Sequence, residues 1–86
     1  MNNINIIKVN KIISLFDADI DLNMELVTES GREFICFVFS INNLDVSGMY
    51  KLNKFITYSV FGGILSENIV KKLQEELEII YLDNFY

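Results

Sequence analysis

The stretch Asp17-Ala-Asp-Ile-Asp-Leu-Asn-Met-Glu-Leu-Val-Thr-Glu29 decides the fold of this chain, because apolar and polar residues alternate along it. Successive side chains of a β-strand point to opposite faces of the sheet. The alternation therefore predicts a strand over residues 18–28 with one buried apolar face and one acidic face. Carboxylates two positions apart then stand about 6.6 Å from one another, at a rise of roughly 3.3 Å per residue. The acidic face carries Asp17, Asp19, Asp21 and Glu25.

A return strand is predicted over residues 33–41. It follows a turn at residues 29–32, in which Gly31 supplies a positive φ. Both faces of the return strand are apolar, and such a strand is usually central and covered on both sides. One face carries Phe34, Cys36 and Val38, and the other carries Ile35, Phe37, Phe39 and Ile41.

The remaining sheet is expected from turn signals at Asn42-Asn43 and Ser47-Gly48, a third long strand over 49–61, and a break at Gly62-Gly63. The segment 4–16 is ambiguous. Its apolar residues fit helical spacing, whereas its β-branched content favours a strand. We expect a short helix that begins after Asn3 or Asn5 and covers the second face of the sheet.

Ser66 is placed to cap the clearest helix, predicted over residues 67–82. Its apolar stripe consists of Ile69, Leu73, Leu77 and Ile80, widened by Val70 and Tyr81. The expected fold is a single small α+β domain over residues 1–86. It consists of an antiparallel sheet of three to four strands with the C-terminal helix packed on one face.

Charge and composition exclude several classes of partner. The net charge is −5, from twelve acids against seven bases, which disfavours direct nucleic-acid binding and anionic membranes. A basic surface on another protein is the electrostatic complement. The single cysteine rules out an intramolecular disulfide, and neither a secretory leader nor a membrane span is visible, so we expect a cytoplasmic protein.

No pattern in the chain predicts catalysis, a cofactor or a metal. A calcium loop that began at Asp17 would need Gly and Glu where Leu22 and Thr28 stand. With one cysteine and no histidine, one chain cannot assemble a tetrahedral zinc site or a histidine-dependent triad. Cys36 lies between apolar neighbours and is expected to be a structural thiol rather than a nucleophile.

The end of the predicted helix is apolar nearly all round. Such a surface is either buried in its own domain or in contact with another chain. We expect a weak homodimer through this end, since a symmetric dimer is the commonest way in which soluble proteins cover such an apolar patch. The residues off the main stripe are Ile79, Leu82, Phe85 and Tyr86.

These observations favour a small acidic, non-enzymatic inhibitor that occludes a basic, nucleic-acid-binding surface of a larger protein. Small acidic proteins of phages and mobile elements, including anti-CRISPR and other anti-defence proteins, are similar in size, charge and composition. No motif carries that likeness, so it assigns no residue a role. Two alternatives remain: an immunity protein or antitoxin that neutralises a cognate toxin, and a homo-oligomeric structural or scaffold protein.

Overall fold

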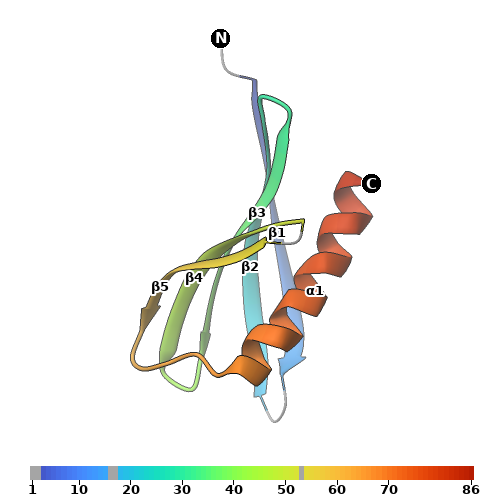
Figure 1. Ribbon diagram of the computed structural model, residues 1–86. Coiled ribbons are helices and arrows are strands. Elements are labelled where there is room, and N and C mark those ends of the chain that lie inside the picture. Colours follow the sequence, from blue (N-terminus) through green and yellow to red (C-terminus); the bar gives the residue numbers. More distant parts are fainter. Residues whose placement is uncertain (1–2, 16–17, 53) are drawn as a thin grey trace.

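The computed structural model describes residues 3–15, 18–52 and 54–86, and in them the chain forms five strands followed by one helix (Figure 1). Every strand is antiparallel to the next, and the order across the sheet is the order along the chain. The elements are β1 (Ile4–Leu15), β2 (Ala18–Glu29), β3 (Arg32–Ile41), β4 (Leu44–Lys51), β5 (Lys54–Phe61) and α1 (Glu67–Phe85).

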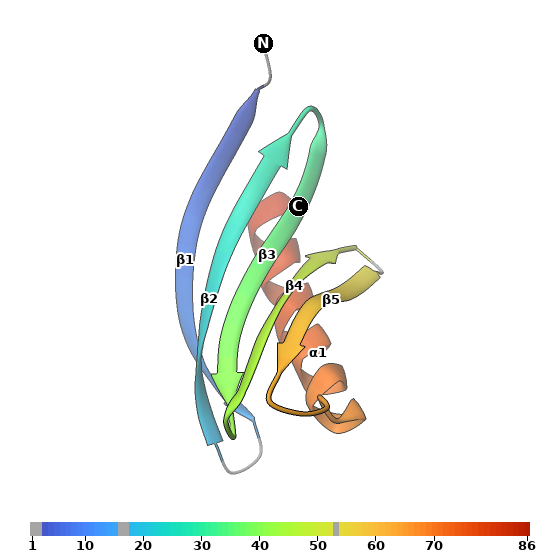
Figure 2. The same cartoon turned by 90° about the vertical axis from the view of Figure 1, so that its left-hand side faces the viewer.

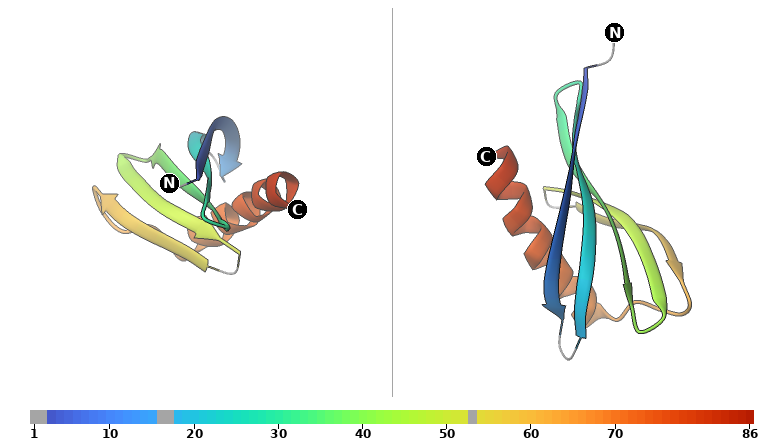
Figure 3. Two further views of the ribbon diagram at one scale, coloured as in Figure 1. Left: turned by 90° about the horizontal axis from the view of Figure 1, so that it is seen from above. Right: turned by 180° about the vertical axis from the view of Figure 1, so that it is seen from behind.

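Helix α1 covers one face of the sheet, and the core lies between them (Figure 2). Leu73 and Leu77 of the helix are 0% exposed, as are Leu22 of β2 and Ile35 of β3. Tyr81 adds a polar link, since its hydroxyl donates a hydrogen bond of 3.4 Å to the Glu33 carbonyl oxygen. Figure 3 shows the result: a strongly twisted sheet with the helix on one side only.

Local turn chemistry fixes the hairpins. Ser30 and Gly31 have φ of 52° and 80°, and Asn42 and Asn43 have 50° and 66°. Two consecutive positive φ values give the twist that two-residue hairpin connections need. The predicted turns at these two places are therefore confirmed. At the helix, Ser66 Oγ accepts from the Ile69 amide at 3.3 Å, which confirms the predicted cap.

Several expectations about the sheet are wrong. The turn expected at Ser47-Gly48 is instead an irregularity within strand β4, where the pairing with β5 shifts. Residues 4–15 form strand β1 rather than a helix, paired with β2 along its whole length. Because β1 lies in the sheet, it does not cover the second face. The expected third strand over 49–61 is two strands, since Lys51 pairs with Lys54 across a tight connection. The sheet thus has five strands rather than three or four.

Strand β3 is central, as predicted, but it is covered on one side only. Ile35, Phe37, Phe39 and Ile41 are at most 4% exposed beneath the helix. On the opposite face Phe34 and Cys36 are half-buried and Val38 is 49% exposed. The expectation of two covered faces is therefore wrong for the described residues, because the segment expected to supply the second cover extends the sheet instead.

Phe37→Ala should lower the free energy of unfolding by roughly 3–5 kcal/mol, the usual range for a buried phenylalanine. Phe37 is 3% exposed and stacks on Phe39 and Phe55, with ring centroids 6.2 and 5.3 Å away. Urea unfolding followed by circular dichroism measures the loss. Val38→Ala, the next position on the outer face, is the control and should cost within about 0.5 kcal/mol. Equal losses at both positions would contradict the placement of β3.

Candidate functional site

The face of the sheet turned away from α1, called the open face below, carries the predicted acidic row. Asp19 and Asp21 of β2 are exposed there, and Glu25 is half-buried. Their apolar neighbours Ile20, Leu22 and Met24 are at most 3% exposed on the helix side. Asp17, the fourth predicted carboxylate, lies outside the described residues. The acidic face predicted for residues 18–28 is thus present, and it is the face that the helix leaves uncovered.

Strand β1 supplies neutral hydrogen-bond donors to this row. Ser14 Oγ donates to Asp19 Oδ1 at 2.7 Å. Asn10 Nδ2 donates to Asp21 Oδ1 and, at 2.8 Å, to Asn23 Oδ1. These contacts orient the carboxylates without neutralising them, because hydroxyl and amide donors carry no net charge.

The ion pairs of the described residues are elsewhere. Lys11 Nζ lies 3.5 Å from Glu76 on the helix side of the sheet, and Lys72 lies 3.9 and 4.0 Å from Glu75 and Glu76 along α1. In the described part of the chain, no lysine or arginine nitrogen lies within ion-pair distance of the carboxylates of β2. The negative charge of Asp19 and Asp21 therefore remains available to an approaching partner, whereas Glu25 has Lys8 as its cross-strand neighbour.

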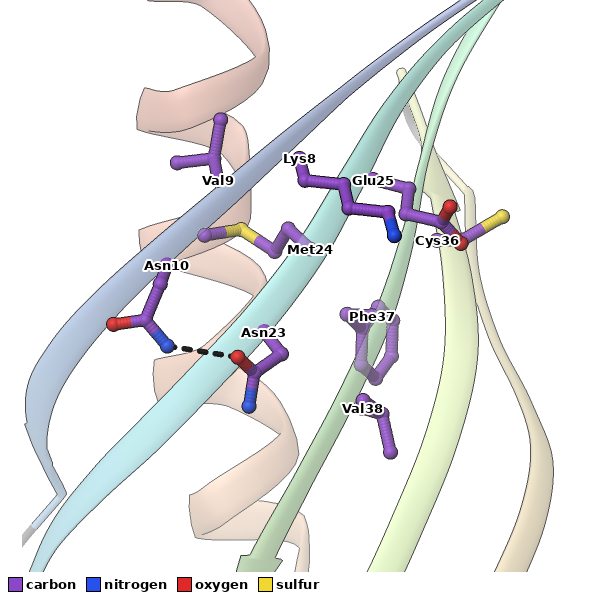
Figure 4. Close-up of a pocket in the computed structure, with 9 residues that line it drawn as sticks. All are labelled: Lys8, Val9, Asn10, Asn23, Met24, Glu25, Cys36, Phe37 and Val38. Atoms are coloured by element: carbon purple, nitrogen blue, oxygen red, sulfur yellow. Dashed lines mark hydrogen bonds between the residues drawn. The ribbon is translucent and has the colours of Figure 1, made fainter.

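A shallow depression of about 430 Å³ crosses the middle of the open face (Figure 4). Two cross-strand rows of side chains border it, because the register places Lys8 opposite Glu25 and Glu25 opposite Cys36, and likewise aligns Asn10, Asn23 and Val38. Between these rows run Val9, Met24 and Phe37, whose side chains alternate toward the helix side. The depression thus combines an amine, a carboxylate, amides and apolar groups.

Cys36 borders the depression as a half-buried thiol. Desolvation by burial raises the pKa of this thiol, and the nearby Glu25 carboxylate raises the pKa further. Both causes disfavour the thiolate, which is the nucleophilic form. The arrangement at Cys36 is the opposite of what an active-site cysteine requires.

Exposed apolar side chains flank the acidic row. Ile6 and Ile12 of β1 are 51% and 69% exposed, and Val38 of β3 is 49% exposed. Sequence reasoning missed the contributions of β1 to this face, namely Asn10, Ser14, Ile6 and Ile12. The period-two arrangement of these residues was present in the sequence, but the helical spacing of Ile6, Val9 and Ile13 concealed it.

The predicted C-terminal interface lies on α1, on the other side of the sheet from the acidic row. Ile79, Leu82 and Tyr86 are 51%, 40% and 79% exposed. Phe85 is half-buried, and its ring centroid lies 5.0 Å from that of Tyr81. Three of the four residues are thus accessible, and Phe85 belongs partly to the core. Their role in a dimer stays a prediction.

Within residues 3–15, 18–52 and 54–86, no cluster of three histidine, cysteine, aspartate or glutamate side chains is arranged to hold a metal ion. The same residues contain no helix that is long and apolar enough to cross a membrane. No known protein family, curated protein or solved structure matches the chain significantly.

Glu25→Gln should speed the alkylation of Cys36 by iodoacetamide at any fixed pH near neutrality. The substitution removes a carboxylate that raises the pKa of the thiol, so the thiolate fraction rises, while the effect of burial remains. The measurement is the labelling rate by mass spectrometry across a pH series. Asp19→Asn, farther along the same strand, is the matched control and should leave the rate unchanged. An unchanged rate in Glu25→Gln would contradict the influence of Glu25 on Cys36.

Proposed function

We propose that this protein is a non-enzymatic inhibitor whose open face binds a basic, nucleic-acid-binding surface of a larger protein. The observation that carries the proposal is the position of the acidic row. Asp19 and Asp21 are exposed, and Glu25 is half-buried, on the face that α1 does not cover. A partner surface can reach these side chains without any rearrangement of the fold.

The electrostatics support this reading. Carboxylates two positions apart on one strand are spaced by about 6.6 Å, so they present a regular line of negative charge. The hydroxyl of Ser14 and the amide of Asn10 hold two of these carboxylates in place. A surface that binds phosphates with lysine and arginine side chains is complementary to such a line. Occupying that surface would exclude the nucleic acid by competition.

Apolar side chains beside the acidic row offer a partner the buried contacts that charged side chains alone do not provide. Rim charges mainly govern the association rate and specificity, whereas buried contacts govern the lifetime of a complex. Val38 is 49% exposed, and Cys36 and Phe34 are half-buried next to it on the open face. We therefore expect a partner that presents arginine or lysine side chains around an apolar centre.

Neutralising the row should abolish this binding. The test variant carries Asp19→Asn, Asp21→Asn and Glu25→Gln, and the matched control carries Glu75→Gln, Glu78→Gln and Asp83→Asn on exposed positions of α1. Both variants lose the same charge and should fold, since exposed charges contribute little to stability. Each protein is immobilised, exposed to host lysate, and the captured proteins are quantified by mass spectrometry.

We expect the wild type and the control variant on α1 to capture proteins that the test variant on β2 does not capture. Purified, such a protein should bind nucleic acid, and the wild-type chain should displace that nucleic acid with an affinity that falls as salt rises. Capture that is equal in all three samples would refute a role for the open face. Capture of a toxin with no nucleic-acid-binding surface would favour the antitoxin alternative instead.

A further inference from the structure

Strand β1 forms one edge of the sheet, and its exposed side chains are unusually apolar for an edge. Four of its isoleucines, Ile4, Ile6, Ile7 and Ile12, are 51–69% exposed. The pairing of β1 with β2 is regular from Ile4 to Leu15. Natural edges are usually short, bulged, covered or rich in charge. At the other edge, β5 is shorter and its pairing with β4 is interrupted by a bulge at Ser47 and Gly48.

The hydrogen-bonding groups of β1 that face outward can be assigned from the register. Ser30 donates its amide to the Asn3 carbonyl oxygen at 3.3 Å, one step beyond the pair Ile4–Glu29. Directly opposed residues of an antiparallel pair alternate between hydrogen-bonded and non-hydrogen-bonded. The odd-numbered residues of β1 therefore bond to β2. The even-numbered residues, from Ile4 to Ser14, direct their amide and carbonyl groups away from the sheet.

We propose that this edge pairs with β1 of a second copy of the chain, antiparallel and centred on Val9. Under a two-fold axis through Val9, Ile6 of one copy pairs with Ile12 of the other. In every such pair the two residue numbers add up to eighteen. The even-numbered residues then meet even-numbered residues, so every outward backbone group finds a partner. Because face alternation is preserved, both open faces lie on one side of the joined sheet and both helices lie on the other.

The side chains favour this register over the registers centred on Lys8 or on Lys11. It places Ile6 against Ile12 of the second copy, covering two of the most exposed apolar side chains of the described residues. Lys8 meets Asn10, and Lys11 meets Ile7, so no lysine faces a lysine. Centring the pair on Lys8 or on Lys11 would oppose like charges directly, which destabilises a sheet.

The charge distribution is also compatible with a second copy of the chain at the β1 edge. The chain carries a net charge of −5, yet β1 has two lysines and no acid. In the joined sheet the two β1 strands separate the acidic rows of the two β2 strands. Lys8 of each copy then lies between these rows, which offsets the repulsion between two acidic chains.

Sedimentation velocity at micromolar concentration should give twice the chain mass of 10.0 kDa. Ile12→Lys, at a side chain that is 69% exposed, should return the mass to that of one chain while circular dichroism stays unchanged. Two matched controls, Ile64→Lys and Ile79→Lys, alter side chains that are 91% and 51% exposed and should leave the dimer intact. Ile79→Lys also separates this dimer from one formed through the end of α1.

A cross-link tests the register itself. In a Cys36→Ala background, Val9→Cys places two thiols at a non-hydrogen-bonded pair, whose Cα atoms lie about 4.5 Å apart, within the range that a disulfide spans. Mild oxidation should yield a covalent dimer from Val9→Cys and none from Asn5→Cys, which the register places opposite Ile13. A monomer at all micromolar concentrations, a dimer lost only in Ile79→Lys, or a dimer that Val9→Cys fails to cross-link would each overturn the proposal.

Discussion

The packing of one helix on one face of the sheet is the constraint on which the rest of the structure depends. Leu73 and Leu77 of α1 are 0% exposed, and the helix packs against β1, β3 and β4 on the apolar side of the sheet. That contact decides which side of every strand is interior. The period of a strand is two, so a shift of β2 by one residue would bury Asp19 and Asp21 and expose Ile20 and Leu22. The core and the acidic surface are thus two consequences of one register.

Local signals made much of this fold predictable. The alternation in β2, the positive φ positions at Ser30–Gly31 and Asn42–Asn43, and the Ser66 cap all depend on residues that are close in sequence. The size of the sheet was harder to predict, because an edge strand that extends beyond its covering helix need not alternate cleanly. In β1 only Ile13 and Leu15 are buried, while Ile4, Ile6 and Ile7 are exposed, so apolar residues occupy both faces. That mixture is compatible with helical spacing.

The hairpin between β4 and β5 was not predicted, although the alternation of side chains within residues 49–61 indicates it. Tyr50 and Phe55 lie opposite one another on the helix side of the sheet. Tyr50 has an even number and Phe55 an odd one, yet both face the helix, because a two-residue connection shifts the alternation of side chains by one position. This change in alternation between Tyr50 and Phe55 marks the connection between β4 and β5. The acidic half of the candidate site was predictable from β2 alone, but the donors Asn10 and Ser14 reach it only through strand pairing, which no local pattern encodes.

The division of charge between adjacent strands gives the two surfaces different physical characters. The acidic row of β2 lies one strand inside the edge, where its charge can act on a partner that approaches the open face. The edge itself is apolar and weakly basic, and there backbone groups and isoleucines dominate. A domain of this size buries only about 60–65% of its unfolded surface, so isoleucines that stay exposed add little to an already small stability margin. Any association that covers them binds the folded state alone and stabilises it by mass action. The proposed pairing through β1 would therefore couple stability to self-association, whereas the proposed binding of a basic partner uses the acidic face, which is a separate surface.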